Sequence, residues 1–153
     1  MLQDIIQGLI GTGDEEPAPL SESYTYTQRL QPRCIRLLKL APGPASSPIE
    51  CTVQIHSIDN PPDFEALSYV WGSSADPVII VCDSKRLTVT QNLHAALLQL
   101  RQFDTFRDGR LLWIDAICIN QGDETEKTAQ VRLMREIYSR AHNTTIWLGP
   151  NDD

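Results

Sequence analysis

The stretch that decides the fold runs from residue 111 to residue 149 and reads LLWIDAICINQGDETEKTAQVRLMREIYSRAHNTTIWLG. Its first residues, 111–115, form a short apolar run that stops at the carboxylate of Asp115. A polar loop, 118–123, precedes a helical pattern whose inward positions recur every three or four residues, namely Gln130, Val131, Met134, Ile137, Tyr138 and Ala141. A β-branched run, 144–148, then ends at Gly149. Strand, helix and strand of these lengths predict a βαβ unit with parallel strands and a right-handed crossover.

The residues before this unit predict further strands. Residues 34–40 and 50–58 are expected to form an antiparallel pair, and residues 66–71 a central strand covered on both faces. Residues 77–90 predict a hairpin, followed by a helix to about residue 103 that is capped by Thr90 or Asn92. The predicted fold class is α/β, with a mostly parallel central sheet flanked by helices and an antiparallel N-terminal β addition.

The length and the net charge of the chain limit the class of protein to which it can belong. At 153 residues the chain is expected to be one domain, with residues 1–31 weakly structured and residues 32–153 folded. The formal charge of −7 argues against a nucleic-acid partner or an anionic membrane. Residues 1–10 lack the basic residues of a signal peptide, and no run reaches the ~18 apolar residues of a membrane span. We therefore expect a soluble, cytoplasmic protein.

The basic residues and the cysteines give weaker signals. Four basic residues surround the first predicted strand and are interpreted as a solvated edge that blocks unwanted pairing: Arg29, Arg33, Arg36 and Lys39. The four cysteines, Cys34, Cys51, Cys82 and Cys118, include no Cys-x-x-Cys pair. Because no zinc-ligand spacing appears, we predict free thiols and no metal.

Several motifs occur together in a characteristic order. ALSYVWG at 66–72 is followed by LWIDAICINQ at 112–121, by Glu126-Lys127, Gln130-Val131 and Ile137-Tyr138 in the helix, and by Trp147-Leu148-Gly149. From about residue 34 to residue 149 the chain closely resembles the heterokaryon incompatibility (HET) domain of filamentous fungi. Members of this family usually continue past the last motif, so truncation at the C-terminal end is expected.

The resemblance implies a death-effector role. HET domains trigger cell death when genetically different fungal cells fuse, often as the N-terminal part of larger receptors. The family is also similar to TIR domains, which have a flavodoxin-like sheet, and some of which hydrolyse NAD through a glutamate while others only assemble. The expected function is therefore an incompatibility effector with NAD as substrate and no cofactor, or alternatively a non-enzymatic self-associating module. The expected partners are further copies of the chain and other incompatibility or receptor proteins.

The candidate site is expected where the parallel strands end, because ligands of open α/β sheets bind outside the carboxyl ends of the strands. Glu126, at the start of the long helix, is the candidate catalytic carboxylate for an oxocarbenium-like ribosyl cation. Its alternative role is a helix-start carboxylate paired with Lys127 or Arg132. The candidate substrate-binding residues are Trp71, Gly72, Ser73, Ser74, Asp115, Cys118, Asn120, Gln121 and Gln130.

Each binding candidate has a structural alternative. Asp115 can equally accept backbone N–H bonds within its own loop, and Asn120 and Gln121 can tie that loop down. The loop 72–74 can cradle a phosphate or a ribose, or it can be only a turn. Trp71, beside a glycine, is predicted to line a cleft, whereas Trp113 and Trp147 are predicted as core.

Overall fold

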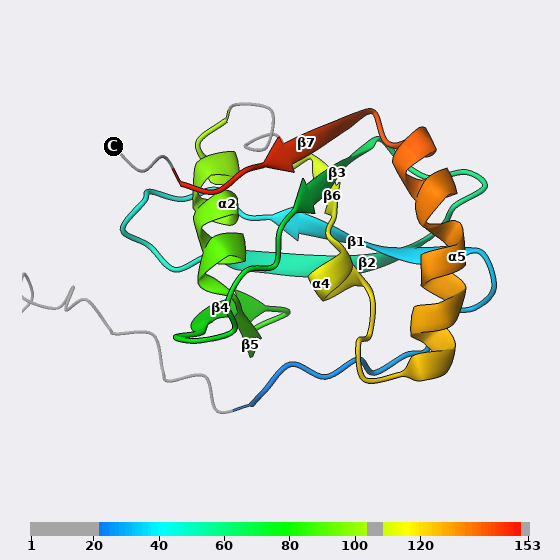
Figure 1. Ribbon diagram of the computed structural model, residues 1–153, viewed down its shortest axis with the longest axis horizontal. Helices are drawn as coiled ribbons and strands as arrows, with labels where there is room; N and C mark the ends of the chain where they lie inside the picture. The colour runs from blue at the N-terminus through cyan, green and yellow to red at the C-terminus, as the bar shows by residue number, and fades with distance from the viewer. Residues whose placement is uncertain (1–21, 104–108, 151–153) are drawn as a thin grey trace, which may run out of the picture.

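The computed structural model describes residues 22–103 and 109–150 and contains one seven-stranded sheet with the order β5-β4-β2-β1-β6-β3-β7 (Figure 1). The strands are β1 Cys34–Leu40, β2 Glu50–Ser57, β3 Phe64–Tyr69, β4 Val78–Cys82, β5 Lys85–Val89, β6 Leu111–Trp113 and β7 Asn143–Trp147. The helices are α2 Gln91–Arg101, α4 Asp115–Cys118 and α5 Glu124–Arg140. The α/β class is confirmed.

The sheet is mixed, so the prediction of a mostly parallel sheet is wrong. β3 pairs in parallel with both β6 and β7, as the βαβ unit requires, and β2 pairs in parallel with β4. Three other pairs, β1–β2, β1–β6 and β4–β5, are antiparallel. The reason is that β1 inserts beside β6, so the antiparallel N-terminal hairpin is continuous with the parallel strands.

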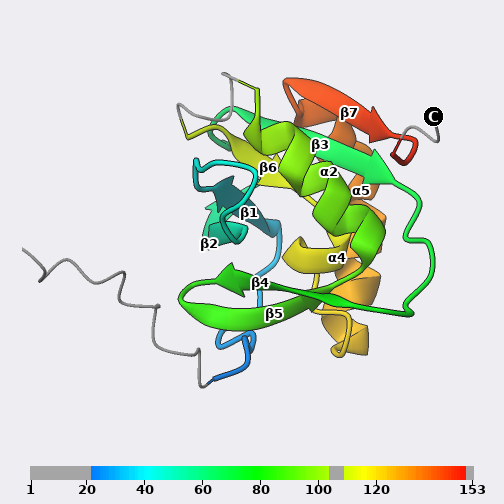
Figure 2. The same cartoon turned by 90° about the vertical axis from the view of Figure 1, so that its left-hand side faces the viewer.

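The two long helices cover opposite faces of β3. Side chains alternate along a strand, so Ala66 and Tyr69 project to opposite faces. Trp113 is the register partner of Ala66 and packs against Tyr138 of α5, whereas Trp147 is the partner of Tyr69 and bonds to α2. Figure 2 shows α2 nearer the viewer than β3, with α5 behind it. Residues 64–67 are accordingly buried, so the prediction of a strand covered on both faces holds for residues 66 and 67. It is wrong for the end of the predicted range, because Val70 and Trp71 lie beyond β3 and are 72% and 44% exposed.

Local chemistry fixes the ends of the elements. The β4–β5 turn is Asp83-Ser84, with φ of 49° and 64°, the left-handed conformation that tight hairpins require. Thr90 caps α2 and Asp123 caps α5, each through a side-chain oxygen that accepts backbone N–H bonds. One inward position was predicted wrongly, because Val131 of α5 is 52% exposed.

The N-terminal strap, which we define as residues 22–28, lies against the free edge of β5. Ser23 forms a parallel bridge with Arg86, the Tyr24 N–H donates to the Arg86 carbonyl, and the Arg86 N–H donates to the Glu22 carbonyl. Of the segment predicted as weakly structured, residues 1–31, the first 21 residues lie outside the described residues. Among the described helices none is long and apolar enough to cross a membrane.

Candidate functional site

Asp115 is the centre of the site that the strand ends form. β6 stops at Trp113, and α4 begins with Asp115 at the carboxyl end of that strand. Trp71, just beyond β3, donates its indole N–H to Asp115 Oδ1 at 3.3 Å. Gln121 donates from Nε2 to the Asp115 carbonyl at 3.0 Å. Three of the predicted binding residues therefore meet.

Asn92, in the first turn of α2, joins the ends of two strands. Its Nδ2 donates to the carbonyl of Val70 after β3, and its Oδ1 accepts the indole N–H of Trp147 in β7 at 2.9 Å. β6 and β7 pair with opposite edges of β3, so the order of the strands along the sheet reverses at β3. Ligands of open α/β sheets usually bind beside such a reversal, at the carboxyl ends of the strands. We call these residues the rim site: Trp71, Asn92, Asp115, Gln121 and Trp147.

Asp115 is a half-buried carboxylate without a cationic partner. Burial raises its pKa above the usual value of 3.8, and the hydrogen bonds from the Ala116 N–H and from Trp71 offset only part of this. Across ranges 22–103 and 109–150 no Lys or Arg lies within salt-bridge distance of it. The phenol of Tyr69 also has a raised pKa, first from burial and then from the charge of Asp115. The rim can therefore accept hydrogen bonds or face a positive charge.

Glu126 has the opposite surroundings. Its side chain is buried, with the residue 4% exposed, and Arg36 binds it through both guanidinium NH groups at 2.8 and 2.9 Å. The backbone N–H groups of Asn120 and Leu30 complete its bonding at 2.7 and 3.3 Å. Burial raises the pKa of Glu126, but the bonds from Arg36 and from these N–H groups outweigh it and lower the pKa. The prediction that Glu126 faces an open cleft is wrong, because every oxygen is already occupied.

The prediction that Arg36 belongs to a solvated strand edge is also wrong, because Arg36 is 2% exposed. It donates to the carbonyls of Cys118 and Gln28 and lies 4.7 Å from the centre of the Tyr26 ring. The Tyr26 hydroxyl donates to the Ile117 carbonyl at 2.7 Å. This anchor group, which we define as Tyr26, Arg36 and Glu126, ties the N-terminal strap and β1 to α4 and α5.

Three further predicted site residues belong to the anchor side rather than to the rim. Gln130 is 2% exposed and donates from Nε2 to the Cys34 carbonyl at 2.9 Å. Cys118 is fully buried, and burial raises the pKa of its thiol to about 12. Asn120 turns its side chain to the Gly122 N–H at 3.1 Å, which is the loop-tying alternative.

The loop 72–74 adjoins the rim but is built as a turn. Gly72 has φ of +71°, and the Ser73 hydroxyl accepts the Ala75 N–H at 3.0 Å. Trp71, which was predicted to line a cleft, is 44% exposed. Trp113 is core as predicted, whereas Trp147 is only half-buried.

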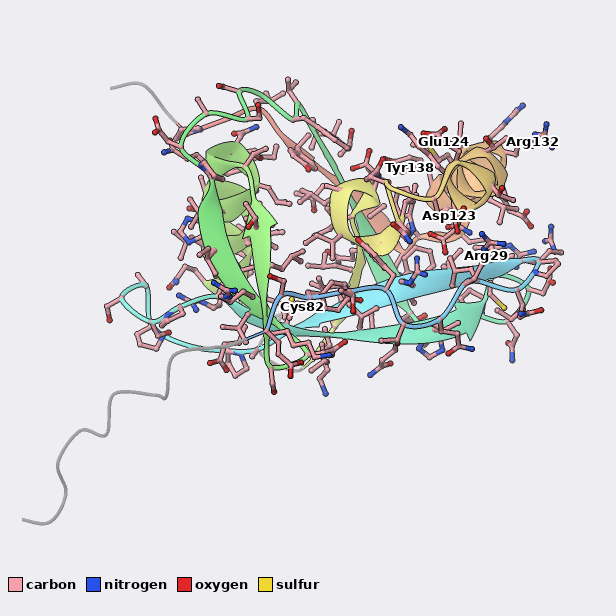
Figure 3. All side chains as sticks on the ribbon, turned by 90° about the horizontal axis from the view of Figure 1, so that it is seen from below. Arg29, Cys82, Asp123, Glu124, Arg132 and Tyr138 are labelled. Carbon is pink, nitrogen blue, oxygen red and sulfur yellow. The ribbon has the colours of Figure 1, made fainter. Side chains whose placement is uncertain are left out.

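Two residues that organise the site were missed. Arg36 shares a strand face with Leu38 and Leu40, and this alternation was the available signal that it points inward. Asn92 was considered only as a helix cap, and no local pattern indicates its contact with Trp147, which is distant in sequence. In the described part of the chain no group of three His, Cys, Asp or Glu side chains could hold a metal ion. Figure 3 labels Arg29 and Asp123, which form an ion pair at the start of α5.

Comparison with known proteins agrees with the motif order. The family model described as "Heterokaryon incompatibility protein (HET)" matches residues 64–153. Heterokaryon incompatibility protein 6, OR allele, of Neurospora crassa is 43% identical over 130 residues, which cover 78% of this chain and 19% of that protein. The chain thus spans about a fifth of the length of this relative, and no solved structure matches. The chain belongs to the HET family.

Proposed function

We propose that this chain is the effector part of a fungal incompatibility protein and that it triggers programmed cell death on non-self recognition. The support is its family and its 43% identity to a protein named for heterokaryon incompatibility. The proposal includes action in the cytoplasm, as a homo-oligomer and together with other incompatibility or receptor proteins.

The proposed chemistry is hydrolysis of the nicotinamide–ribose bond of NAD at the rim site. The observation that carries it is the half-buried carboxylate of Asp115, which is hydrogen-bonded to the exposed Trp71 and forms no ion pair with the part of the chain that the structure describes. Such a carboxylate can stabilise an oxocarbenium-like ribosyl cation while an indole face stacks on a ring. Asp115 therefore takes the role that the sequence suggested for Glu126.

The test uses concentrated full-length chain incubated with NAD, with released nicotinamide measured by chromatography. We expect Asp115→Asn to lower the rate by about 10²–10³-fold, the usual loss when one electrostatic stabiliser is removed. Trp71→Ala should also lower the rate of nicotinamide release. Arg29→Ala, which removes an exposed ion pair, is the matched control and should keep the wild-type rate. If Asp115→Asn releases nicotinamide at the wild-type rate, NAD hydrolysis does not take place at the rim site.

A second candidate function, self-association without catalysis, is favoured by a separate observation. The β7 patch consists of Val70, Ile146 and Leu148, which are 72%, 68% and 91% exposed. Ile146 pairs with Ser68, so strand alternation places all three side chains on one face. Within the described residues β7 pairs only with β3, so its outer edge keeps free backbone groups that can bind another strand.

Sedimentation combined with a fungal viability assay separates the two candidates. Ile146→Lys should prevent association and cell death if assembly is the output. Ile79→Lys is the matched control, because Ile79 is a 55% exposed strand residue on β4. If concentrated wild-type protein leaves NAD intact, and death still depends on Ile146 and not on Asp115, the assembly function replaces the catalytic one.

A further inference from the structure

Cys51 and Cys82 are neighbours on adjacent strands. They are register partners in the parallel pair β2–β4, both are free thiols, and they are 4% and 0% exposed. The Cys51 thiol also contacts the Val81 carbonyl at 3.5 Å. Hydrogen bonding to Cys82, and then burial, raise the pKa of the Cys51 thiol well above its usual range.

The spacing of such partners suits a disulfide. Adjacent strands lie about 4.8 Å apart, within the Cα–Cα range of about 4.4–6.8 Å that disulfides span. Cys34 has Ser57 as its register partner, and Cys118 lies in α4, so neither has a cysteine opposite it on a neighbouring strand. Figure 3 places Cys82 where β4 reaches the β1–β2 part of the sheet.

We infer that Cys51 and Cys82 are a modification site at which a peroxide oxidant forms a disulfide. One thiol loses its proton and the thiolate attacks hydrogen peroxide, which gives a sulfenic acid and hydroxide; the hydroxide takes up the released proton to form water. The second thiol then attacks the sulfenic sulfur, and a second water leaves as the S–S bond forms. Two thiols and one peroxide thus give one disulfide and two waters, and a thiol reductant reverses the change.

The disulfide would strengthen one of the two shortest junctions in the sheet. β2 and β4 share only two register pairs, as do β1 and β6, whereas β1 and β2 share seven and β4 and β5 share five. The backbone bonds from Val81 N–H to Ile49 and from Asp83 N–H to Cys51 add to this short ladder. A covalent bond here holds the β4–β5 hairpin to the sheet and restricts the unfolded chain, so oxidation should raise the melting temperature.

The N-terminal strap controls access to the pair. Tyr24 of the strap packs against the core cluster that contains both cysteines, and its N–H donates to the Arg86 carbonyl of β5. A cavity of about 280 Å³ lies beside the strap and is lined in part by Tyr24, Val53 and Asp83, but by neither cysteine. Buried, protonated thiols react slowly, so oxidation requires the strap to move from the β5 edge.

Peptide mass spectrometry of the oxidised full-length chain tests the pairing. No Lys or Arg lies between Lys39 and Lys85, so trypsin leaves both cysteines in one peptide, residues 40–85. After hydrogen peroxide and alkylation we expect this peptide to lose two hydrogens and to take up no alkyl group, while Cys34 and Cys118 stay alkylated. Dithiothreitol should restore two alkylation sites and the original melting temperature.

Variants separate this pair from other cysteine chemistry. Cys51→Ser and Cys82→Ser should each abolish the mass loss, and the matched Cys34→Ser should retain it. Tyr24→Ala should speed oxidation several-fold relative to Arg29→Ala. The proposal is overturned if both thiols of folded wild-type protein remain alkylatable after peroxide, or if Cys82 pairs with Cys118. Equal rates in Tyr24→Ala and Arg29→Ala would overturn the control of access by the strap.

Discussion

Asp115 and Glu126 lie close in sequence, yet the fold gives them opposite environments. Glu126 is buried against Arg36 and two backbone N–H groups, and its pKa is lowered. Asp115 is half-buried beside an indole, with no Lys or Arg of the described residues within salt-bridge distance, and burial raises its pKa. The difference shows that compensation, rather than burial alone, decides whether a carboxylate holds the fold together or remains available to a ligand.

The strongest test of this comparison is Glu126→Gln. The change leaves the Arg36 guanidinium buried without its counter-charge, which typically costs about 3–5 kcal/mol. We therefore expect a large loss in the free energy of unfolding measured in urea. Asp115→Asn should cause no such loss, because Asn still accepts the Trp71 N–H.

A double replacement checks the reason for that loss. Arg36→Met with Glu126→Leu removes both charges and keeps apolar volume, so it should recover much of the stability lost in Glu126→Gln. If the double variant is less stable than Glu126→Gln, the anchor group acts through its hydrogen bonds to Asn120, Leu30 and Gln28 rather than through charge compensation.

The parts of the fold that repeat locally could be predicted from the sequence, and the parts made by distant pairing could not. The apolar spacing of Ile137 and Tyr138 indicated α5, and the runs on either side indicated β6 and β7. No local pattern records that β1 pairs with β6 at Leu38–Leu112, which made the sheet mixed. Local signals therefore predicted the parallel unit but not its antiparallel neighbour.

The candidate site was predicted only in part, for the same physical reason. Glu126 and Gln130 are four residues apart and so lie on one face of α5, but what this face packs against depends on where β1 lies. Arg36 on β1 forms a buried ion pair with Glu126. The carboxylate that the sequence suggested as catalytic is therefore not exposed to a ligand. Trp71 and Asp115 could be placed together because both follow parallel strands, whose ends meet at one edge.

The next largest effect is expected on the rim side, from Asn92→Ala. The change leaves the Trp147 indole N–H and the Val70 carbonyl without their partner. Because these groups are partly reached by water, we expect a loss of about 1 kcal/mol in the free energy of unfolding. The control is Gln91→Ala, an exposed neighbour on the same helix turn. Equal stability of both variants would show that Asn92 does not hold the ends of β3 and β7 together.

The pH dependence of stability should differ in sign between the two carboxylates. Glu126 has a lowered folded pKa, so its contribution is complete above its ordinary value of 4.5 and disappears as the pH falls through the folded pKa. Asp115 has a raised folded pKa, so the folded state binds its proton more tightly and loses stability as the pH rises from 3.8 through that pKa. Asp115→Asn should therefore be slightly more stable than wild type at neutral pH, and the difference should vanish on acidification. Urea midpoints from pH 3 to pH 8 measure both trends. An Asp115→Asn variant that is less stable than wild type at neutral pH would contradict the comparison.

The smallest effect should come from Arg29→Ala, which removes the ion pair with Asp123 at the start of α5. The two groups are 2.9 Å apart, but the Arg29 side chain is 65% exposed, so water and salt screen the attraction. Asp123 keeps its capping bonds to the Thr125 and Glu126 N–H groups, which hold its pKa below the usual range together with Arg29. The urea midpoint should therefore stay within error of wild type at both low and high salt. A loss that approaches that of Glu126→Gln would mean that the Arg29–Asp123 pair, and not the buried Arg36 pair, holds α5 in place.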